Sequence, residues 1–323
     1  MQSTLVSIIV TTYNSANYII ETLESIKAQT WKNIELIITD DCSTDKTIQL
    51  CSNWLEENNT LFERTEIISV PQNTGVAANC NRGIKASNAD WIKFIAGDDI
   101  LLPNCIDDNM RFVTDNNNVA IVFSQVNLYQ DLFLQNNFVT AIPEHYPMNI
   151  MNPEFSASDQ YKLLLLSDRI TFTPSSFFNK KALTKVNGFD ESLKFVEDYP
   201  MWLKLTRAGN KLYFFEKPTV GYRKHEAASN NMANYGLFKP LYLKSGPFLK
   251  KNVYPFLPWD IAADMKYVLG VSNIFQNAGM NKKTSFFEML YKSVTVYFNP
   301  FRFIIYLKKK ILGLGRTNLF YAD

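Results

Sequence analysis

Two adjacent carboxylates, Asp98 and Asp99, follow the apolar segment 91–95. Adjacent carboxylates repel each other, and the nearest basic residue in the sequence is Lys93. A divalent cation relieves such repulsion, and Mg²⁺ or Mn²⁺ prefers oxygen ligands of this kind. Because Gly97-Asp98-Asp99 is also typical of a turn, the pair taken alone is compatible with either a metal site or a simple turn.

A second acidic pair, Asp40 and Asp41, follows the apolar segment 34–38, and Tyr13 follows the segment 5–10. An aspartate at such a position can accept a hydrogen bond from a ribose hydroxyl or from a base. An aromatic ring can stack on that base. The alternatives are acids that favour a helix N-terminus and a tyrosine that covers the edge of a sheet.

A third acidic pair, Glu197 and Asp198, follows the apolar residues Phe195 and Val196 and precedes a helical pattern that contains Trp202. A carboxylate beside apolar groups has a raised pKa and can accept a proton from a hydroxyl group, as a general base does. The alternative is again an acid that interacts favourably with a helix N-terminus.

Strand-like and helix-like segments alternate over the first hundred residues. We expect strands at 5–10, 34–38, 66–70 and 91–95 and helices at 19–29, 46–57 and 79–86, with 43–45 as the cap of the second helix. This alternation predicts βαβ units and a mostly parallel sheet. Ligands bind at the carboxyl ends of such strands, where the polar clusters fall, so we expect these clusters to meet at one edge.

The rest of the chain is less regular. We expect a strand at 119–128, extended chain at 171–178, and helices at 158–166, 180–186 and 199–208. From about residue 227 the βαβ alternation ends, and the sequence becomes aromatic, Lys-rich and helical in pattern.

The composition excludes several classes of protein. The 323 residues are 46% hydrophobic and 20% charged with a net charge of +2, which argues against disorder and against a basic nucleic-acid binder. Four cysteines without a Cys-x-x-Cys pair predict reduced thiols in a cytosolic protein. No apolar run approaches the roughly 18 residues of a membrane span. We therefore expect a cytoplasmic protein that at most lies on a membrane surface.

Six motifs in this order resemble those of the family 2 glycosyltransferases, which have the GT-A fold. The resemblance covers about residues 5 to 225, and its motifs are Val6 to Asn14, Asp40 to Asp45, Asn73-Thr74-Gly75 with Asn81-Arg82-Gly83, Gly97-Asp98-Asp99, Asn187 to Glu191, and Glu197-Asp198 before Trp202-Leu203. It implies an α/β GT-A domain at 1–226, with a nucleotide-binding half at 1–99 and an acceptor half at 100–226, followed by a mainly helical region at 227–323.

The resemblance also implies an activity, which is the inverting transfer of a sugar from a UDP-sugar to a hydroxyl group of a saccharide acceptor. Bacterial members that build surface polysaccharides, such as O-antigen or capsule, often use a polyprenyl-diphosphate-linked acceptor at the inner face of the plasma membrane. The resemblance assigns a role to each matching residue: Thr11, Tyr13, Asn14 and Asp41 would hold the nucleoside, Asp98 would approach the ribose, Asp99 would ligate Mg²⁺ or Mn²⁺, Asp198 would be the base, and Glu197 would orient it or the acceptor.

Two departures from the family pattern affect these expectations. Cys80 stands where the family often has an arginine, so a phosphate or base contact is missing or comes from Arg82 or Lys85. The acidic motif reads Gly-Asp-Asp rather than Asp-x-Asp. In addition, His225 matches a histidine that can reach the metal or the diphosphate in the family, with a surface histidine in a basic loop as the alternative.

Two other classes of protein compete with this hypothesis. A Rossmann oxidoreductase needs a Gly-x-Gly-x-x-Gly loop after the first strand, and the segment 11–15 contains no glycine. A non-catalytic nucleotide-sugar-binding or scaffold protein on the same fold stays open, because fold alone does not establish function.

A helical wheel of residues 301–314 gives a basic amphipathic helix. Its apolar arc contains Lys308 as a snorkelling side chain, which suits either an anionic membrane surface or packing within the protein or a homo-oligomer.

Overall fold

The computed structural model describes residues 4–193, 197–225, 236–238 and 240–321. These residues form two compact units, one of residues 1–161 and 168–226 and the other of residues 162–167 and 227–323.

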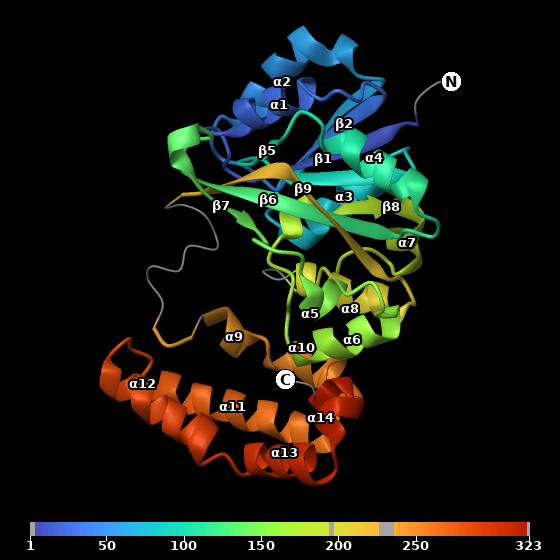
Figure 1. The fold of residues 1–323 in the computed structure, drawn as a ribbon. Helices are drawn as coiled ribbons and strands as arrows, with labels where there is room; N and C mark the ends of the chain where they lie inside the picture. The colour runs from blue at the N-terminus through green and yellow to red at the C-terminus, as the bar shows by residue number, and fades with distance from the viewer. Residues whose placement is uncertain (1–3, 194–196, 226–235, 239, 322–323) are drawn as a thin grey trace. The chain divides into compact units, whose positions relative to one another are not determined.

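The first unit is built on one mixed sheet (Figure 1). Within the described residues its nine strands are β1 (Val6–Thr12), β2 (Ile34–Asp40), β3 (Arg64–Ser69), β4 (Trp91–Ala96), β5 (Ile100–Leu101), β6 (Ile121–Gln130), β7 (Phe138–Ile142), β8 (Phe177–Asn179) and β9 (Leu212–Lys224). The helices are α1 (Ile19–Lys27), α2 (Thr47–Asn58), α3 (Val76–Ala86), α4 (Cys105–Asp115), α5 (Met148–Met151), α7 (Lys180–Lys185) and α8 (Asp198–Arg207). Helix α6 (Ala157–Leu166) begins in this unit, and its residues from 162 onward belong to the second unit.

The strand order is β3-β2-β1-β4-β8-β6-β9-β5, with β7 paired to β6. The first four of these strands are parallel, and Thr12 aligns with Asp40 while Thr11 aligns with Ala96. The carboxyl ends of β1, β2 and β4 therefore lie at one edge of the sheet. This arrangement confirms the predicted GT-A architecture with a mostly parallel sheet and places the polar segments after these strands side by side.

Burial on both faces explains why β1 and β2 are almost continuous apolar runs. Val6, Ile8, Ile9 and Val10 are fully buried, as expected for a parallel strand covered by helices. On one face α3 packs so closely that a Cβ atom on Gly83 would lie 2.4 Å from Ile9 Cγ2. This close approach fixes the position of α3 behind the strand ends.

Helix α8 packs on the same face of the sheet as α3. Ile9 neighbours Phe94 in the register of β1 and β4, and Phe94 contacts Phe178 edge to face. Phe178 in turn stacks on Trp202 of α8, with ring centroids 6.0 Å apart. The N-terminus of α8, with the predicted base, is thereby carried by the same layer as α3.

Several segments of the first unit differ from the expectation: α4, β7 and α5 were not predicted, and two further segments also differ. The segment 171–178 is not extended throughout, because residues Thr173–Ser175 form a 3₁₀ turn. Buried Lys93 donates hydrogen bonds to the carbonyl groups of Pro174 (2.6 Å) and Ser176 (3.2 Å), which satisfies the backbone of this segment. Strand β9, the partner of β6 over its whole length, was not predicted at all.

The second unit is helical over its described residues, as expected for the C-terminal region. Its helices are α9 (Pro240–Lys244), α10 (Gly246–Asn252), α11 (Trp259–Asn277), α12 (Ser285–Lys292), α13 (Pro300–Ile311) and α14 (Leu314–Thr317). Residues 227–235, 239, 322 and 323 of the expected helical region lie outside the described part. In the described part of the chain, no helix is long and apolar enough to cross a bilayer.

Helix α13 packs against α11 through charged groups. Lys308 lies 3.0 Å from the carboxylate of Asp260, which is fully buried, and Arg302 lies 3.2 Å from Asp264. The prediction that Lys308 is a snorkelling side chain was therefore wrong. A buried carboxylate needs a cationic partner, and Lys308 is that partner.

Candidate active site

The ends of β1 and β2 are joined by Asp40, whose carboxylate accepts hydrogen bonds from Thr12 Oγ1 (2.8 Å) and from the backbone N–H of Ser43 (2.7 Å). Asn14 links the two following loops in the same way. Its N–H donates to Ser43 Oγ (2.8 Å), and its side-chain oxygen accepts from the N–H of Thr44 (2.8 Å). Asp40 and Asn14 thus shape the strand edge.

Asp41 is buried and fully occupied by protein donors. It accepts from the N–H groups of Thr74 (3.0 Å) and Gly75 (2.7 Å) and from the guanidinium of Arg82 (2.8 Å). Burial by itself would raise the pKa of Asp41, but these hydrogen bonds outweigh it and lower the pKa below its usual value. Asp41 therefore stays ionised and holds the loop before α3 against the end of β2.

Tyr13 and Thr11 lie on the same edge. The Tyr13 side chain is 52% exposed, so its ring is free to meet a ligand at the strand ends. Thr11 is half-buried, and its carbonyl accepts from the N–H of Gly97 (3.0 Å), which ties the end of β1 to the acidic motif after β4.

Asp98 and His225 are brought together from positions far apart in the sequence. His225 Nε2 lies 3.1 Å from Asp98 Oδ2, and the other ring nitrogen lies 3.3 Å from the hydroxyl of Tyr18. The carboxylate of Asp98 is 32% exposed, whereas the imidazole is largely buried. This pair combines an oxygen and a nitrogen donor, one of which is open to solvent.

Asp99 has a different environment from its neighbour. Its side chain is buried, and Oδ1 accepts from the backbone N–H of Arg223 (2.9 Å). Burial, and then the adjacent charge of Asp98, raises the pKa of Asp99 well above its usual value, although Arg223 opposes this shift. The carboxylate of Asp99 is therefore engaged inside the protein, whereas that of Asp98 is partly open to solvent.

Arg223 is a site residue that the sequence did not reveal as one. Its Nε donates to the carbonyl of Asp98 (2.8 Å), a terminal nitrogen bonds the carboxylate of Glu21, and the guanidinium lies over the rings of Tyr18 (4.7 Å) and Phe133 (4.2 Å). The tertiary structure thus brings to the Asp98–Asp99 pair a cationic residue that is distant in the sequence. The available signal was the spacing of Arg223 and His225, since alternate residues of a strand share one face.

The donors at this position fit a divalent cation only in combination with a ligand. Among the described residues, no three His, Cys, Asp or Glu side chains gather into a metal-holding group. Mg²⁺ commonly takes one or two protein carboxylates and completes its shell with phosphate oxygens and water. The Asp98–His225 pair fits that pattern, and a cation held there would neutralise charge on a diphosphate.

Glu197 and Asp198 form a second acidic centre at the start of α8. Burial of the carboxyl group, the charge of Glu197 and the charge of Asp168 raise the pKa of Asp198 well above its usual value, although a hydrogen bond from Thr173 opposes this shift. Burial also raises the pKa of Glu197. Asp168 was not predicted from the sequence. The apolar residues Phe195 and Val196 that motivated the prediction lie outside the described residues.

Helix α3 is joined to the loop before α8. The side chain of Asn81 pairs with the backbone of Phe189, accepting from its N–H (2.8 Å) and donating to its carbonyl (3.0 Å). Gly188 has a φ of 60°, and a Cβ atom there would lie 2.4 Å from Asn81 Oδ1, so only glycine fits. The two family motifs around Asn81 and Gly188 are therefore in contact.

Cys80, the residue before Asn81, is buried. Burial and then the charges of Glu197 and Asp198 raise the pKa of the Cys80 thiol.

These features agree with the relationships of the chain to known proteins. The family model of glycosyl transferase family 2 matches residues 7–185, and the chain belongs to this family. It is a glycosyltransferase. A Rickettsia typhi protein described as an uncharacterized glycosyltransferase is 32% identical over 253 residues, which are 77% of this chain and 73% of the relative. A Haemophilus influenzae protein with the same description is 26% identical over 72% of this chain and 69% of its own length.

Solved structures share the fold at low sequence identity. Staphylococcus aureus TarS in complex with UDP-GlcNAc has a TM-score of 0.59 and 17% identity over 98% of this chain and 89% of its own. The mannosyltransferase PcManGT from Pyrobaculum calidifontis, in complex with GDP-Man and Mn²⁺, has a TM-score of 0.54 and 14% identity over 98% of this chain and 88% of its own.

Proposed function

We propose that this glycosyltransferase transfers a sugar from a UDP-sugar to a hydroxyl group of a saccharide acceptor, with inversion at the anomeric carbon. The observation that supports this proposal best is the presence of two separate acidic centres in the first unit. One is the outward-facing Asp98 with His225, which suits a diphosphate and its cation. The other is Asp198, whose raised pKa suits a general base.

The reaction needs only one proton transfer, from the acceptor hydroxyl group to the protein. Asp198 accepts the proton of the acceptor hydroxyl group while that oxygen attacks the anomeric carbon from the side opposite the diphosphate. The new glycosidic C–O bond forms, the bond from the anomeric carbon to the diphosphate breaks, and UDP departs with the electron pair. Glu197, directly before the base, orients Asp198 or the acceptor.

For the cation, the geometry favours Asp98 over Asp99. The sequence assigns the metal to Asp99 and the ribose to Asp98, and that assignment stays a prediction. We propose instead that Asp98 and His225 hold Mg²⁺ or Mn²⁺, because Asp98 is the exposed carboxylate and Asp99 is already engaged by the Arg223 backbone. The charge that the cation neutralises is that of the departing diphosphate.

The decisive test of the activity is the release of UDP from a panel of UDP-sugars, with GDP-mannose included because a solved neighbour binds GDP-Man. With a saccharide acceptor and Mn²⁺ we expect turnover of one donor, loss of that turnover in EDTA, and an inverted anomeric proton in the product by NMR. Tight UDP-sugar binding without turnover of any donor and acceptor pair would favour the non-catalytic binding or scaffold protein.

We expect Tyr13→Ala to weaken UDP binding without lowering the melting temperature. The ring is half exposed, so the fold does not depend on it, and stacking of a base on an aromatic ring contributes ~1–3 kcal/mol. Calorimetric titration with UDP measures the effect, and Tyr13→Phe is the control that keeps the ring. Unchanged UDP affinity in Tyr13→Ala would remove Tyr13 from the site.

Asp41→Ala should weaken UDP binding and also lower the melting temperature, because it leaves Arg82 and two loop N–H groups without their acceptor.

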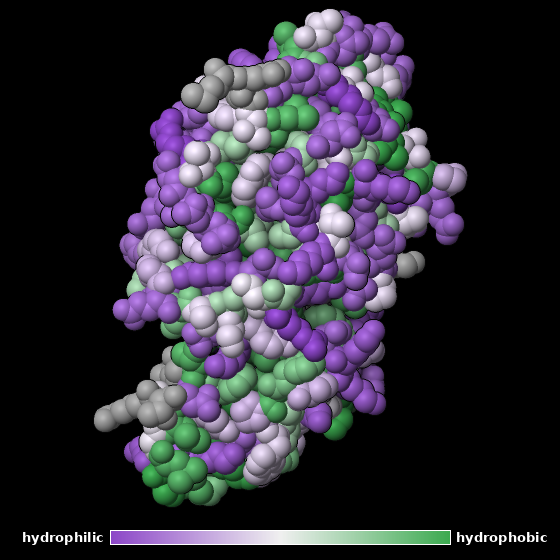
Figure 2. Space-filling model, turned by 90° about the vertical axis from the view of Figure 1, so that its right-hand side faces the viewer, coloured by the Kyte–Doolittle hydropathy of each residue, from purple (hydrophilic) through white to green (hydrophobic). Residues whose placement is uncertain are grey.

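We further propose that the acceptor is lipid-linked, as in polysaccharide synthesis such as that of O-antigen or capsule, and that the second unit meets the membrane surface. Its α13 exposes Phe303, Tyr306 and Ile311, and the next residue, Leu312, is exposed as well, although Arg302 and Lys308 pair with α11. Figure 2 shows hydrophobic side chains exposed among polar ones on the molecular surface. Exposed aromatic and aliphatic side chains beside lysines suit the interface of an anionic bilayer.

We expect the protein to sediment with anionic vesicles at low salt and to be released as salt rises. Phe303→Ser with Ile311→Ser should reduce the bound fraction by roughly tenfold, since it removes two side chains that would insert into the interface. Leu132→Ser with Leu134→Ser is the matched control, because these leucines are similarly exposed but lie in the first unit. Equal loss in both pairs, or no sedimentation of the wild type at any salt concentration, would contradict the membrane proposal.

A further inference from the structure

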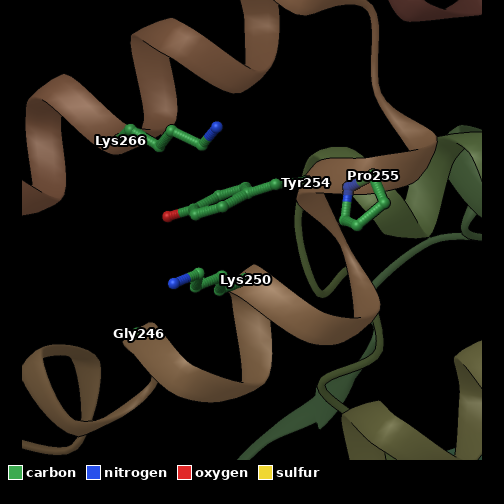
Figure 3. Close-up of a pocket in the computed structure, with 5 residues that line it drawn as sticks. All are labelled: Gly246, Lys250, Tyr254, Pro255 and Lys266. Carbon is green, nitrogen blue, oxygen red and sulfur yellow. The ribbon is translucent and has the colours of Figure 1, made fainter.

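The second unit contains a cavity of about 430 Å³ that the proposed sugar transfer does not use. It is lined by Gly246 and Lys250 of α10, by Tyr254 and Pro255 after that helix, and by Lys266 of α11 (Figure 3). This volume is in the range of sites for small molecules and cofactors, and it far exceeds the needs of a single inorganic ion.

Two lysine side chains give the cavity its charge. Figure 3 shows the Lys250 and Lys266 side chains on opposite sides of the Tyr254 ring, and Lys266 Nζ lies 5.2 Å from the centroid of that ring. Among the residues that the structure describes, neither ammonium group pairs with a carboxylate. The cavity therefore presents two positive charges without an anionic partner.

Tyr254 supplies a third polar group. The residue is only 8% exposed, and its buried hydroxyl has no hydrogen-bond partner within the described part of the chain. Such a group is costly in a folded protein and calls for an external acceptor. Burial raises the pKa of Tyr254, so the phenol keeps its proton and can donate it to a hydrogen bond. In Figure 3 this hydroxyl is directed to the same side as the Lys250 ammonium.

The charge distribution of the sequence favours an anion at the second unit over the first. Residues 227–323 contain thirteen Lys or Arg and four Asp or Glu, a net charge of +9, whereas residues 1–226 carry a net charge of −7. The overall charge of +2 conceals this asymmetry. A basic region raises the local concentration of anions and speeds their capture.

We propose that this cavity binds a phosphate or diphosphate group carried by a larger ligand, at a site separate from the nucleotide-sugar site of the first unit. The exposed side chains of Lys250 and Lys266 lie on opposite sides of the Tyr254 ring, and the Tyr254 hydroxyl is directed to the Lys250 side. A group with at least two negative charges and several acceptor oxygens would therefore meet a donor on each side of the ring, and charge-assisted hydrogen bonds of this kind are strong. Lysine serves as a point-charge partner of phosphate. The remaining volume accommodates the part of the ligand that carries the phosphate.

The test is a calorimetric titration of the full chain with inorganic diphosphate in EDTA at low salt, so that the cation-dependent site of the first unit does not contribute. We expect Lys250→Gln with Lys266→Gln to weaken binding by at least ~10-fold. Tyr254→Phe keeps the ring and should weaken binding by ~3–10-fold, without a lower melting temperature. The matched control is Lys282→Gln with Lys283→Gln, which removes two exposed lysines of the same unit and should change the affinity by less than ~2-fold.

Two further arms identify the source of the phosphate. Phosphatidylcholine vesicles with and without phosphatidic acid are compared with soluble diphosphate, each with wild type and with the Lys250→Gln, Lys266→Gln variant. Sensitivity of soluble diphosphate binding to that variant supports a soluble phosphate ligand, and sensitivity confined to phosphatidic acid vesicles supports a lipid headgroup. The proposal is overturned if wild type binds neither probe, or if the control pair weakens binding as much as the cavity pair. Glycosyl transfer enters none of these readouts, so the outcome does not decide whether the proposed sugar transfer is correct.

Discussion

Asp198→Asn is expected to reduce the rate of sugar transfer by ~10²–10⁴-fold while UDP-sugar binding stays nearly unchanged. The amide keeps the size of the side chain at the start of α8, but it cannot accept the proton of the acceptor hydroxyl group. Single-turnover transfer and calorimetric UDP-sugar binding measure the two quantities. Parallel loss of binding and transfer would make Asp198 a structural or donor-binding residue, and Glu197 would become the candidate base.

The pH dependence gives a second readout of the same residue. Burial and the neighbouring acids raise the pKa of Asp198, so its basic form is populated only above that raised value, and kcat/KM for the acceptor should increase with pH through it. Because the charge of Glu197 contributes to the shift, Glu197→Gln should move this increase to lower pH. Asp168→Asn should move it in the same direction. An unchanged profile in both variants would argue against Asp198 as the titrating base.

Asp98→Ala is expected to reduce transfer by at least ~100-fold, because it removes the exposed carboxylate that would hold the cation against the diphosphate. The sequence predicts the same loss for Asp99→Ala. The two variants are distinguished by Mn²⁺ binding in the presence of UDP. We expect Asp98→Ala to lose it, while Asp99→Ala retains it.

Asp99→Ala should instead reduce the stability of the fold. It leaves the buried N–H of Arg223 without an acceptor, which costs about 1–3 kcal/mol and appears as a lower melting temperature. Loss of metal binding in Asp99→Ala with none in Asp98→Ala would restore the sequence-based assignment. Full activity of Asp98→Ala in EDTA would exclude a cation at this position altogether.

Local patterns in the sequence were sufficient to predict the first half of the sheet. The strands β1, β2 and β4 are buried on both faces, so each is an apolar run that ends in polar residues, and this pattern is visible without the fold. Parallel pairing then brings Thr11, Asp41 and Asp98 to one edge by topology alone. The family motifs, read in order, were enough to predict the GT-A fold and glycosyltransferase activity.

The apolar pattern of the sequence did not predict strand β9, because residues typical of a turn interrupt it. Glu216, Lys217 and Pro218 interrupt its alternation and are typical of a turn, yet the strand continues past them. Its register against β6 shifts at these residues: Ser124, Gln125 and Val126 of β6 pair with Phe215, Pro218 and Val220, so the unpaired residues bulge from β9 itself. The long ladder with β6, together with the short pairing with β5, stabilises this segment as one strand.

The order of residue types along the chain was enough to predict polar side chains at the strand ends, but which of them stay open to a ligand depends on long-range contacts in the folded chain. Arg223 contacts Asp99 from 124 positions away, and this contact, with burial, separates an engaged Asp99 from an outward Asp98. Likewise, the helical wheel predicts a snorkelling Lys308, but in the folded chain this lysine pairs with the buried carboxylate of Asp260. Both outcomes depend on burial and on long-range pairing of charge, and neither quantity is encoded in local spacing.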